Sequence, residues 1–471
     1  MSNPQNKTTK DSEKLGNMPI GKLLLQMSLP AIIGMLVMVL YNITDTIFVS
    51  KFVGKYAIGG MSIVMPITMI ISVMGMTIGI GGGTLIAKYL GAQSIQKANK
   101  TFGNMVSLIL ITMVPATIIG YLFPDQVLKL FGAEGKLYPF AKDYYMIVLG
   151  GSPILGVAMM LNNAIRSEGK SKIAMYTMFI SAIINIVLDY IFIIELNWGI
   201  KGAAWATNIA QLGSALYLIW IYTSKRSVIE LEPTDIKFCT STSKEILKVG
   251  SSTFARQGSF SILAIIVNHA LLHFGTEDDV AIYGILGRIF MFMIFPIFGI
   301  AQGFMPIASY NLGAKKPARI LSVFNLSVIF STVVATFFFL LIYLFPQQVV
   351  KPFSNDQAFL KATINALKTS SLVIPLVGLQ IIGSAYFQAM GQVSRALLTT
   401  LSRQLFFLSP LIWVVPLVTS YQNIWYAFPI ADLLSIIITL IVLTPPYLRL
   451  KRGQQSLSHK SERFELTTNK T

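Results

Sequence analysis

Charged residues are scarce in this chain: Asp, Glu, Lys and Arg together make up 12% of its 471 residues. Soluble domains carry roughly 25% charged residues, so the composition argues against a water-soluble protein of this length. The 54% hydrophobic content also argues against disorder, whose signature is low hydrophobicity with high charge. A helix that spans a bilayer needs about 20 apolar residues. The composition therefore predicts a polytopic, all-α membrane protein.

Cysteine and histidine are almost absent. The single cysteine, Cys239, cannot form an intramolecular disulfide, and no Cys/His set has metal-ligand spacing. A nucleotide-binding P-loop is missing as well, because Ala164 stands where the first glycine before Gly169-Lys170-Ser171 would be needed. We therefore expect no enzymatic activity, no resident cofactor and no metal site built from cysteine or histidine.

Positive charge is in excess, with a formal net charge of +17. The basic residues lie in the tails and interhelical loops and form no continuous basic face, so we expect no nucleic-acid partner. Of the 37 Lys and Arg residues, 25 fall in the two tails and the even-numbered loops and 9 in the odd-numbered loops, when residues at the very ends of spans are counted with the adjoining loop; the other three, Arg256, Arg288 and Arg403, lie within spans. By the positive-inside rule, this bias places both termini in the cytoplasm.

Hydropathy predicts twelve spans in two lobes of six. The predicted spans are 24–50, 58–87, 102–123, 139–165, 173–195, 202–222, 247–273, 280–311, 321–345, 365–388, 396–418 and 424–448. Prolines within them, such as Pro153 and Pro375, predict bends. The longest polar connection falls midway and divides the chain. The predicted parts are a cytoplasmic N-terminal tail 1–23, an N-lobe 24–222, a cytoplasmic linker 223–246, a C-lobe 247–448 and a cytoplasmic C-terminal tail 449–471.

The two halves repeat at an offset of 222 residues. Pro153 and Gly169 fall on Pro375 and Gly391, and Leu90-Gly91-Ala92 falls on Leu312-Gly313-Ala314. Each half holds an even number of helices, so both start from the same side of the membrane. We therefore expect lobes related by a pseudo-two-fold axis along the membrane normal, with the substrate site between them.

An ionisable residue inside a span raises the free energy of membrane insertion, so its presence indicates a functional or structural role. The N-lobe offers Asp45 and Asp189, and Asn185 shares a helix face with Asp189 at spacing i, i+4. Thr207 and Gln211 share a face of the sixth span in the same way. Two carboxylates with an amide and a hydroxyl can share a proton or ligate a small hard cation, and both are coupling-ion chemistries. The alternative is that these groups only join helices by hydrogen bonds.

The C-lobe differs from the N-lobe in charge. Its span residues include Arg256, Arg288, Arg403 and Asp432, and Leu411 stands where the repeat would place Asp189. We expect Arg256 or Arg288 to pair with backbone carbonyls or with Asp432. Arg403 lies near the inner end of its span, where its side chain could extend to the membrane surface.

Four segments together form a specific pattern. They are Leu40-Tyr41-Asn42-Ile43-Thr44-Asp45-Thr46-Ile47-Phe48-Val49, Gly202-Ala203-Ala204-Trp205-Ala206-Thr207, Gln302-Gly303-Phe304-Met305-Pro306 and Tyr310-Asn311-Leu312-Gly313-Ala314. These segments resemble the multidrug and toxic compound extrusion (MATE) family, and Arg256-Gln257 is similar to its MepA-like and DinF-like bacterial branch. The resemblance covers about residues 20 to 450.

The resemblance implies a twelve-helix, two-lobe antiporter that exports lipophilic organic cations in exchange for Na⁺ or H⁺. Its cation site maps onto Asp45, Asn185, Asp189 and Thr207. Arg256 and Gln388 stand near positions where some members carry carboxylates. The residues that we expect to line the substrate cavity are Tyr41, Asn163, Gln211, Arg256 and Arg288.

We expect a monomer in the inner (plasma) membrane of a bacterium, with membrane lipids as its other partners. A flippase or exporter of a lipid-linked or other amphiphilic metabolite is the alternative function, which an arginine-lined cavity would favour and the Asp45/Asp189 pair disfavours. A membrane-embedded transferase is a third class, but the clustered acidic or histidine motifs that it needs are missing from the sequence.

Overall fold

The computed structural model describes residues 12–224, 226–230, 235–354 and 356–468, and within them the side chains of Lys55 and 453–468 are not described. The described residues are almost entirely helical and contain no strand, which confirms the all-α prediction. Parts of the predicted tails and linker (1–11, 225, 231–234 and 469–471) lie outside the described residues.

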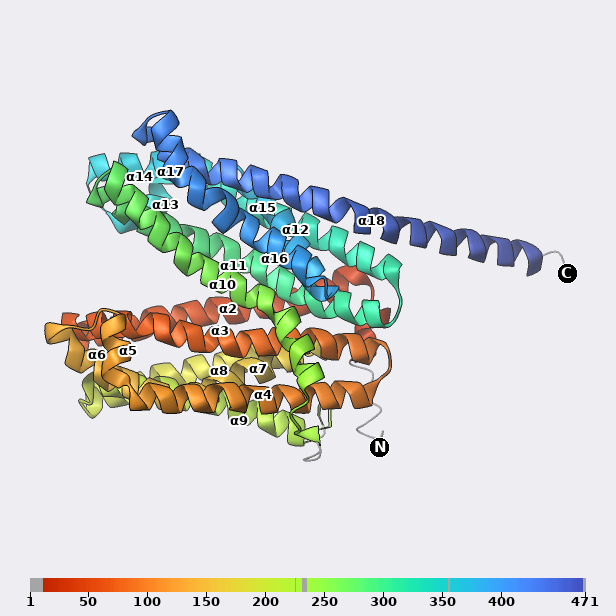
Figure 1. Cartoon of the computed structure of the whole chain (residues 1–471), viewed down its shortest axis with the longest axis horizontal. Coiled ribbons are helices and arrows are strands. Elements are labelled where there is room, and N and C mark those ends of the chain that lie inside the picture. Colours follow the sequence, from red (N-terminus) through yellow and green to blue (C-terminus); the bar gives the residue numbers. More distant parts are fainter. Residues whose placement is uncertain (1–11, 225, 231–234, 355, 469–471) are drawn as a thin grey trace. The chain divides into compact units, whose positions relative to one another are not determined.

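The chain divides into two compact units (Figure 1). Of the described residues, those within 12–17 and 29–254 form unit 1, and those within 18–28 and 255–468 form unit 2. The long helices α2 (Ile20–Phe52) and α10 (Thr240–Phe274) each contribute to both units.

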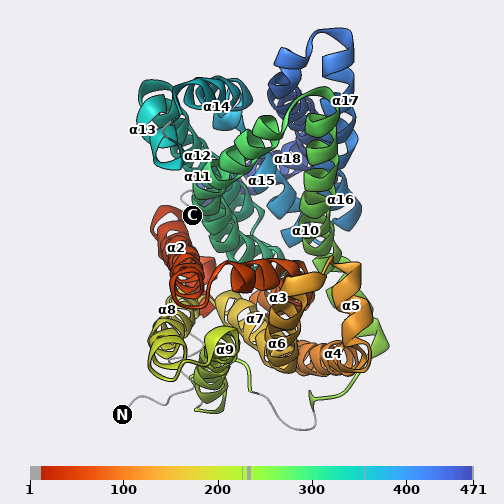
Figure 2. The same ribbon diagram turned by 90° about the vertical axis from the view of Figure 1, so that its left-hand side faces the viewer.

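Unit 1 is a helical bundle whose helices are seen nearly end-on in Figure 2. Besides most of α2 and the start of α10, its elements are α3 (Lys55–Gly91), α4 (Ile95–Leu122), α5 (Pro124–Leu130), η1 (Gly135–Leu137), α6 (Tyr138–Gly150), α7 (Ser152–Ser167), α8 (Ser171–Asp189), the π-helical η2 (Tyr190–Glu195) and α9 (Gly199–Thr223).

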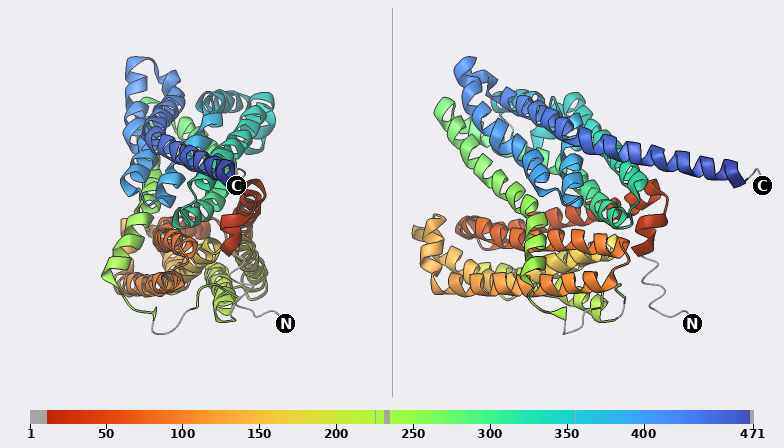
Figure 3. Two further views of the ribbon diagram at one scale, coloured as in Figure 1. Left: turned by 90° about the vertical axis from the view of Figure 1, so that its right-hand side faces the viewer. Right: turned by 45° about the vertical axis from the view of Figure 1, so that its right-hand side comes forward.

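Unit 2 continues with α10 and ends with the longest helix, α18 (Ala427–Thr468), which extends well past the other helices of its unit (Figure 3). The elements between them are α11 (Glu277–Gly313), α12 (Pro317–Leu344), α13 (Pro346–Val350), η4 (Lys351–Phe353), α14 (Gln357–Ser370), α15 (Ile374–Ala389), α16 (Val393–Leu401), the π-helical η5 (Ser402–Leu408), α17 (Ser409–Val418) and η6 (Tyr421–Tyr426). The sequence predicts that the last span ends at residue 448, but α18 continues as helix to Thr468, so the helix does not end where the predicted span ends.

The backbone repeats at the offset seen in the sequence. Gln93 and Lys315 both adopt φ 56°, in the left-handed region that non-glycine residues rarely enter. Phe123 and Phe345 end α4 and α12 with nearly the same dihedral angles, φ −128° and −127°. Since such local conformations depend on the surrounding packing, their recurrence supports a structural repeat of the six-helix half.

The fourth and tenth predicted spans are broken helices. α6 and α7 meet at a bend of 52°, and α14 and α15 at a bend of 51°. Pro153 and Pro375 stand in the first turns of α7 and α15, where the missing N–H group is tolerated. The predicted proline bends are confirmed at both positions.

Nine helices of the described residues are long and apolar enough to span a membrane, or up to eleven if each bent pair counts as one span. α9, which lies where the sixth span is predicted, is not among these. Large apolar side chains such as Leu40, Ile118 and Leu122 are exposed, as expected for side chains that face lipid.

Glycines allow close helix packing in unit 1. A Cβ atom at Gly79 of α3 would lie 3.1 Å from Asn163 of α7, and one at Gly82 would lie 2.2 Å from the sulfur of Met105 on α4. The segment Gly79-Ile80-Gly81-Gly82-Gly83 therefore lets α3 pack closely against neighbouring helices.

Candidate functional site

The predicted acidic residues lie in the interior of unit 1. Asp189 is the last residue of α8, directly before the π-helical turn η2, and Asn185 lies one turn earlier. Both side chains are fully buried, and Asp45 of α2 is 7% exposed. A π-helical turn shifts the register of a helix and is frequent at functional sites. The acidic residues therefore occupy a dry interior beside an irregular turn.

The carboxyl groups of Asp45 and Asp189 lie within electrostatic range of each other. Their polar atoms are nevertheless mostly unsatisfied. Among the described residues, no hydrogen-bond partner is present for Oδ1 of Asp45, either carboxylate oxygen of Asp189, or either amide atom of Asn185. Ser181, one turn before Asn185 on α8, has a buried hydroxyl in the same situation. Buried polar groups are nearly always satisfied, so these atoms are available to bind a proton, a cation or water.

Tyr144 of α6 is part of this cluster, although the sequence analysis did not identify it. Its side chain is 8% exposed and lies near Thr207 and within electrostatic range of Asp45 and Asp189. Tyr41 of α2 also lies in the electrostatic range of both carboxyl groups. No pattern in the sequence distinguishes Tyr144, because aromatic residues within spans usually face lipid or fill the core.

We call Asp45, Asn185, Asp189, Thr207, Tyr41 and Tyr144 the acid cluster. It brings together five of the predicted site residues from α2, α8 and α9 and adds one from α6. Its chemistry fits a coupling ion: carboxylate, amide and hydroxyl oxygens are the ligands of hard cations, and two close carboxyl groups can also share a proton. The described residues hold no group of three or more His, Cys, Asp or Glu residues that could bind a metal ion.

Two other predicted cavity residues have different surroundings. Asn163 donates a hydrogen bond from its amide to the carbonyl of Met159, 2.8 Å away, and packs against Gly79. Gln211 lies partly buried on α9, one turn beyond Thr207. Neither is linked to the acid cluster by a hydrogen bond in the described part of the chain, so their role in lining a cavity stays a prediction.

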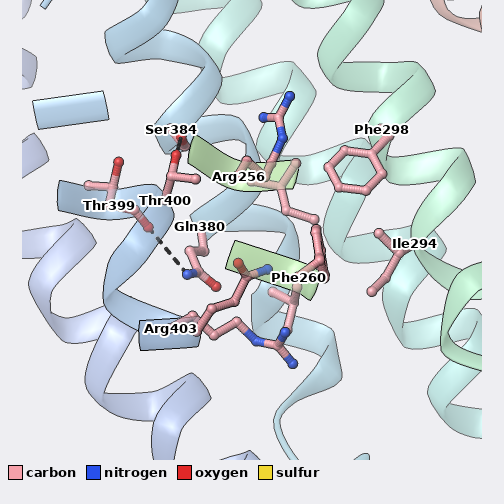
Figure 4. A pocket seen from close by; sticks show the side chains of 12 residues that line it. Arg256, Phe260, Ile294, Phe298, Gln380, Ser384, Thr399, Thr400 and Arg403 are labelled. Carbon is pink, nitrogen blue, oxygen red and sulfur yellow. Dashed lines mark hydrogen bonds between the residues drawn. The ribbon is translucent and has the colours of Figure 1, made fainter. Parts of the chain in front are cut away.

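Arg256 lines a pocket within unit 2, and Arg288 does not. The pocket has an empty volume of about 490 Å³ and is formed by helices α10, α11, α15, α16 and the π-helical η5 (Figure 4). Arg288 of α11 is exposed. The lining residues are Arg256, Phe260, Ile294, Phe298, Val377, Gln380, Ile381, Ser384, Thr399, Thr400, Arg403 and Gln404.

Arg403 forms an ion pair with Asp432 of α18, whose side chain is 1% exposed. The expectation that Arg403 extends to the membrane surface is therefore wrong, as is the expectation that Asp432 pairs with Arg256 or Arg288. The physical reason is that a buried carboxylate needs an adjacent cation, and the π-helical turn that contains Arg403 packs against α18.

Comparison with known proteins gives a consistent result. A sequence model of the MatE family matches residues 30–191 and 254–414. The multidrug export protein MepA of Staphylococcus saprophyticus is 28% identical over 371 residues, which cover 78% of this chain and 81% of that protein. An FAD transporter of Shewanella oneidensis is 27% identical over 433 residues, which cover 90% of this chain and 94% of that protein.

Solved structures agree with the sequence comparisons. An outward-facing multidrug resistance MATE transporter of the MOP superfamily is 26% identical, with a TM-score of 0.88 over 94% of this chain and 99% of that one. A MOP superfamily transporter from Pyrococcus furiosus, described as having a binding pocket of reverse polarity that suggests a different function, aligns with a TM-score of 0.87, 26% identity and the same coverage. These structures have twelve helices in two lobes. Because the family model matches more than half of its length, this chain belongs to the MatE family of multi-pass membrane transporters.

Proposed function

We propose that this chain is a secondary active antiporter that exports lipophilic organic cations in exchange for H⁺ or Na⁺. Multidrug efflux follows from its family and from its MepA relatives. The coupling ion, the residues that bind it and the charge of the substrate are the proposed part. The observation that supports them is the acid cluster, whose buried carboxylate and amide atoms have no hydrogen-bond partner among the described residues.

The proposed coupling is a competition for the charge of this cluster. A proton or Na⁺ that enters from outside lowers the negative charge of the Asp45/Asp189 pair by one unit and stabilises one conformation. A cationic substrate that arrives from the cytoplasm interacts with the same carboxylates and is favoured when the coupling ion has left. Two ligands that stabilise different states of one protein are exchanged across the membrane by alternating access. Na⁺ would then be a transported coupling ion, and the protein would act as a carrier without a resident cofactor.

Dye uptake into everted membrane vesicles tests this function. Vesicles from cells that express the protein should accumulate ethidium when a proton or Na⁺ gradient is imposed in the exchange direction, and accumulation should stop when an ionophore removes that gradient. Vesicles from cells with an empty plasmid provide the control. Ethidium movement that neither gradient changes would contradict the proposed coupling.

An exporter of an amphiphilic metabolite is the second candidate function. The FAD transporter of Shewanella oneidensis, which resembles this chain over 90% of its length, is named for a substrate that carries phosphate groups. The arginine-containing pocket of unit 2 is the feature of this chain that favours such a substrate.

We also propose a location in the bacterial plasma membrane with both termini and the central linker in the cytoplasm. Cys239, directly before α10, reports on this orientation, because it is exposed and is the only cysteine of the chain. Hydrogen bonds from the backbone and side chain of Thr242 and from the backbone of Ser241 lower the pKa of the Cys239 thiol. The thiolate is the nucleophile, so the residue should react readily with maleimides near neutral pH.

Labelling by a membrane-impermeant maleimide should therefore fail in intact cells and succeed after permeabilisation. A Cys239→Ser variant that carries Glu134→Cys, an exposed position between α5 and η1 on the predicted outer side, should give the opposite pattern. Labelling of Cys239 in intact cells would overturn the proposed orientation.

A further inference from the structure

The pocket of unit 2 carries an unusual charge for an exporter of cations. Among its twelve lining residues, two are arginines and none is acidic. Arg403 is neutralised by its ion pair with Asp432, whereas no carboxylate within 4.0 Å neutralises Arg256 in the described part of the chain. The pocket therefore has a net charge of about one positive unit, and a guanidinium group stays charged at every physiological pH.

The guanidinium group of Arg256 is free to bind a ligand. It lies 5.5 Å from the centre of the Phe298 ring, and no hydrogen bond from its nitrogens to another described residue is present. These nitrogens are also not among the fully buried atoms that lack a hydrogen-bond partner, so they remain accessible. Figure 4 shows the guanidinium groups of Arg256 and Arg403 at different ends of the lining, with polar side chains between them. A planar group with five N–H donors matches the geometry of a carboxylate or phosphate.

The neighbouring polar groups supply further donors. The hydroxyls of Ser384 and Thr400 lie 2.5 Å apart, so one proton joins them and the second remains available to a ligand. Gln404 accepts a hydrogen bond from Ser259, and the amide of Gln380 donates to the carbonyl of Thr399, 3.4 Å away. The other half of the wall is apolar, with Phe260, Phe298, Ile294, Val377 and Ile381. A charged end and an aromatic wall suit a molecule with an anionic group and a flat apolar body.

The pocket also adjoins an irregular backbone segment. Arg403 and Gln404 belong to η5, a π-helical turn of seven residues in the middle of the eleventh predicted span. The π-helical turn in unit 1 comes later in its helix, after Asp189, so the two halves do not share this feature at the repeat offset. Such turns re-aim side chains and are frequent at functional sites.

We propose that this pocket binds the carboxylate or phosphate of an anionic amphiphile, with Arg256 as the residue that contacts the anion. The inference rests on the proposed export function and extends its substrate class: unit 1 binds cations at the acid cluster, and unit 2 binds anionic groups. The protein would then export amphiphiles with an anionic group as well as cations. The same anion chemistry is present in the headgroup of an anionic membrane lipid, so lipid is the second source to be distinguished.

Two dyes of one shape and opposite charge test the proposal. Fluorescein is an anion and rhodamine 123 is a cation on the same three-ring scaffold, so a difference between them reflects charge. Fluorescence anisotropy with the full-length protein in a neutral detergent would measure both affinities. We expect Arg256→Gln to weaken fluorescein binding by about tenfold to a hundredfold, as for a lost charge-assisted hydrogen bond. Rhodamine 123 binding should stay unchanged.

Two further variants separate binding from folding. Arg256→Lys retains the charge and should recover part of the affinity for fluorescein. Arg395→Gln removes an exposed arginine of α16 outside the pocket and should leave both affinities unchanged. Equal affinity of wild type and Arg256→Gln for fluorescein would overturn the proposal, and so would equal weakening of both dyes. Coupled efflux of rhodamine 123 by Arg256→Gln would keep the proposed export function in either case.

Lipid nanodiscs distinguish the two sources of the anion. If phosphatidylglycerol competes with fluorescein in the wild type and this competition is lost in Arg256→Gln, the occupant is a lipid headgroup. If fluorescein binds equally in phosphatidylglycerol and phosphatidylcholine nanodiscs, the occupant is a soluble anionic substrate. Both outcomes support an anion site at Arg256, whereas competition that persists in Arg256→Gln would count against it.

Discussion

Replacement of Asp189 by asparagine should abolish ion-coupled efflux and leave an inserted, stable protein. Asparagine has nearly the same shape as aspartate and can form hydrogen bonds, but it is permanently neutral. The carboxyl group of Asp189 is fully buried, and neither oxygen has a hydrogen-bond partner among the described residues. A proton or Na⁺ removes the cost of such a charge, and Asp189→Asn removes the charge itself. Asp45→Asn should have the same effect.

The measurement is gradient-driven efflux of a cationic dye from proteoliposomes at matched protein amounts. We expect the initial rate of Asp189→Asn to fall at least about tenfold, while its thermal unfolding midpoint in detergent stays within a few degrees of wild type. Asp143→Asn is the matched control, because Asp143 lies beside Tyr144 but forms an exposed ion pair with Lys201 at 3.3 Å. If Asp189→Asn transports like wild type in both Na⁺ and pH gradients, Asp189 only joins helices.

Arg403→Met should destabilise the protein strongly, because it leaves Asp432 buried without a cation. The Asp432 side chain is 1% exposed and that of Arg403 is 19% exposed, so water can replace little of the lost interaction. Removal of one partner of a buried ion pair typically costs about 3–5 kcal/mol. The double variant Arg403→Met/Asp432→Leu should recover most of this loss, because no charge is then left unpaired.

Unfolding of the purified variants in detergent, followed by tryptophan fluorescence, checks this expectation. Lys142→Met supplies the comparison: Lys142 pairs with Asp125 at 2.9 Å, but the side chains are 41% and 51% exposed. Solvent screens an exposed pair, which therefore contributes little to stability, so this variant should unfold nearly like wild type. A double variant that is no more stable than Arg403→Met would show that the cost lies in packing and not in the buried charge.

The fold was largely predictable because a membrane-spanning helix requires a long run of apolar residues, and such runs are visible in the sequence. The hydrophobic runs identify the helices, and the shared offset of Gly169 and Gly391 identifies the repeat that recurs in the backbone. Pro153 and Pro375 marked the two broken helices. The π-helical turns η2 and η5 were not predictable, because their wider hydrogen-bonding pattern has no distinct periodicity in the sequence.

The candidate site was predictable where it lies on one helix. Asn185 and Asp189 share a face because they are four residues apart, and their burial follows from the cost of charge in a span. Tyr144 reaches the acid cluster only through the packing of α6, which no local pattern encodes. The pair of Arg403 and Asp432 was missed for the same reason, since 29 residues separate its members.

Ion movement driven by the substrate tests the central claim most directly. Proteoliposomes should be loaded with a cationic dye such as rhodamine 123, and the opposite movement of ²²Na⁺ and of protons should be followed as the dye leaves. We expect the dye gradient to drive one of these ions inward through the wild type, and to drive neither through Asp189→Asn. Dye that leaves through the wild type without inward movement of either ion would contradict a cation-coupled antiporter.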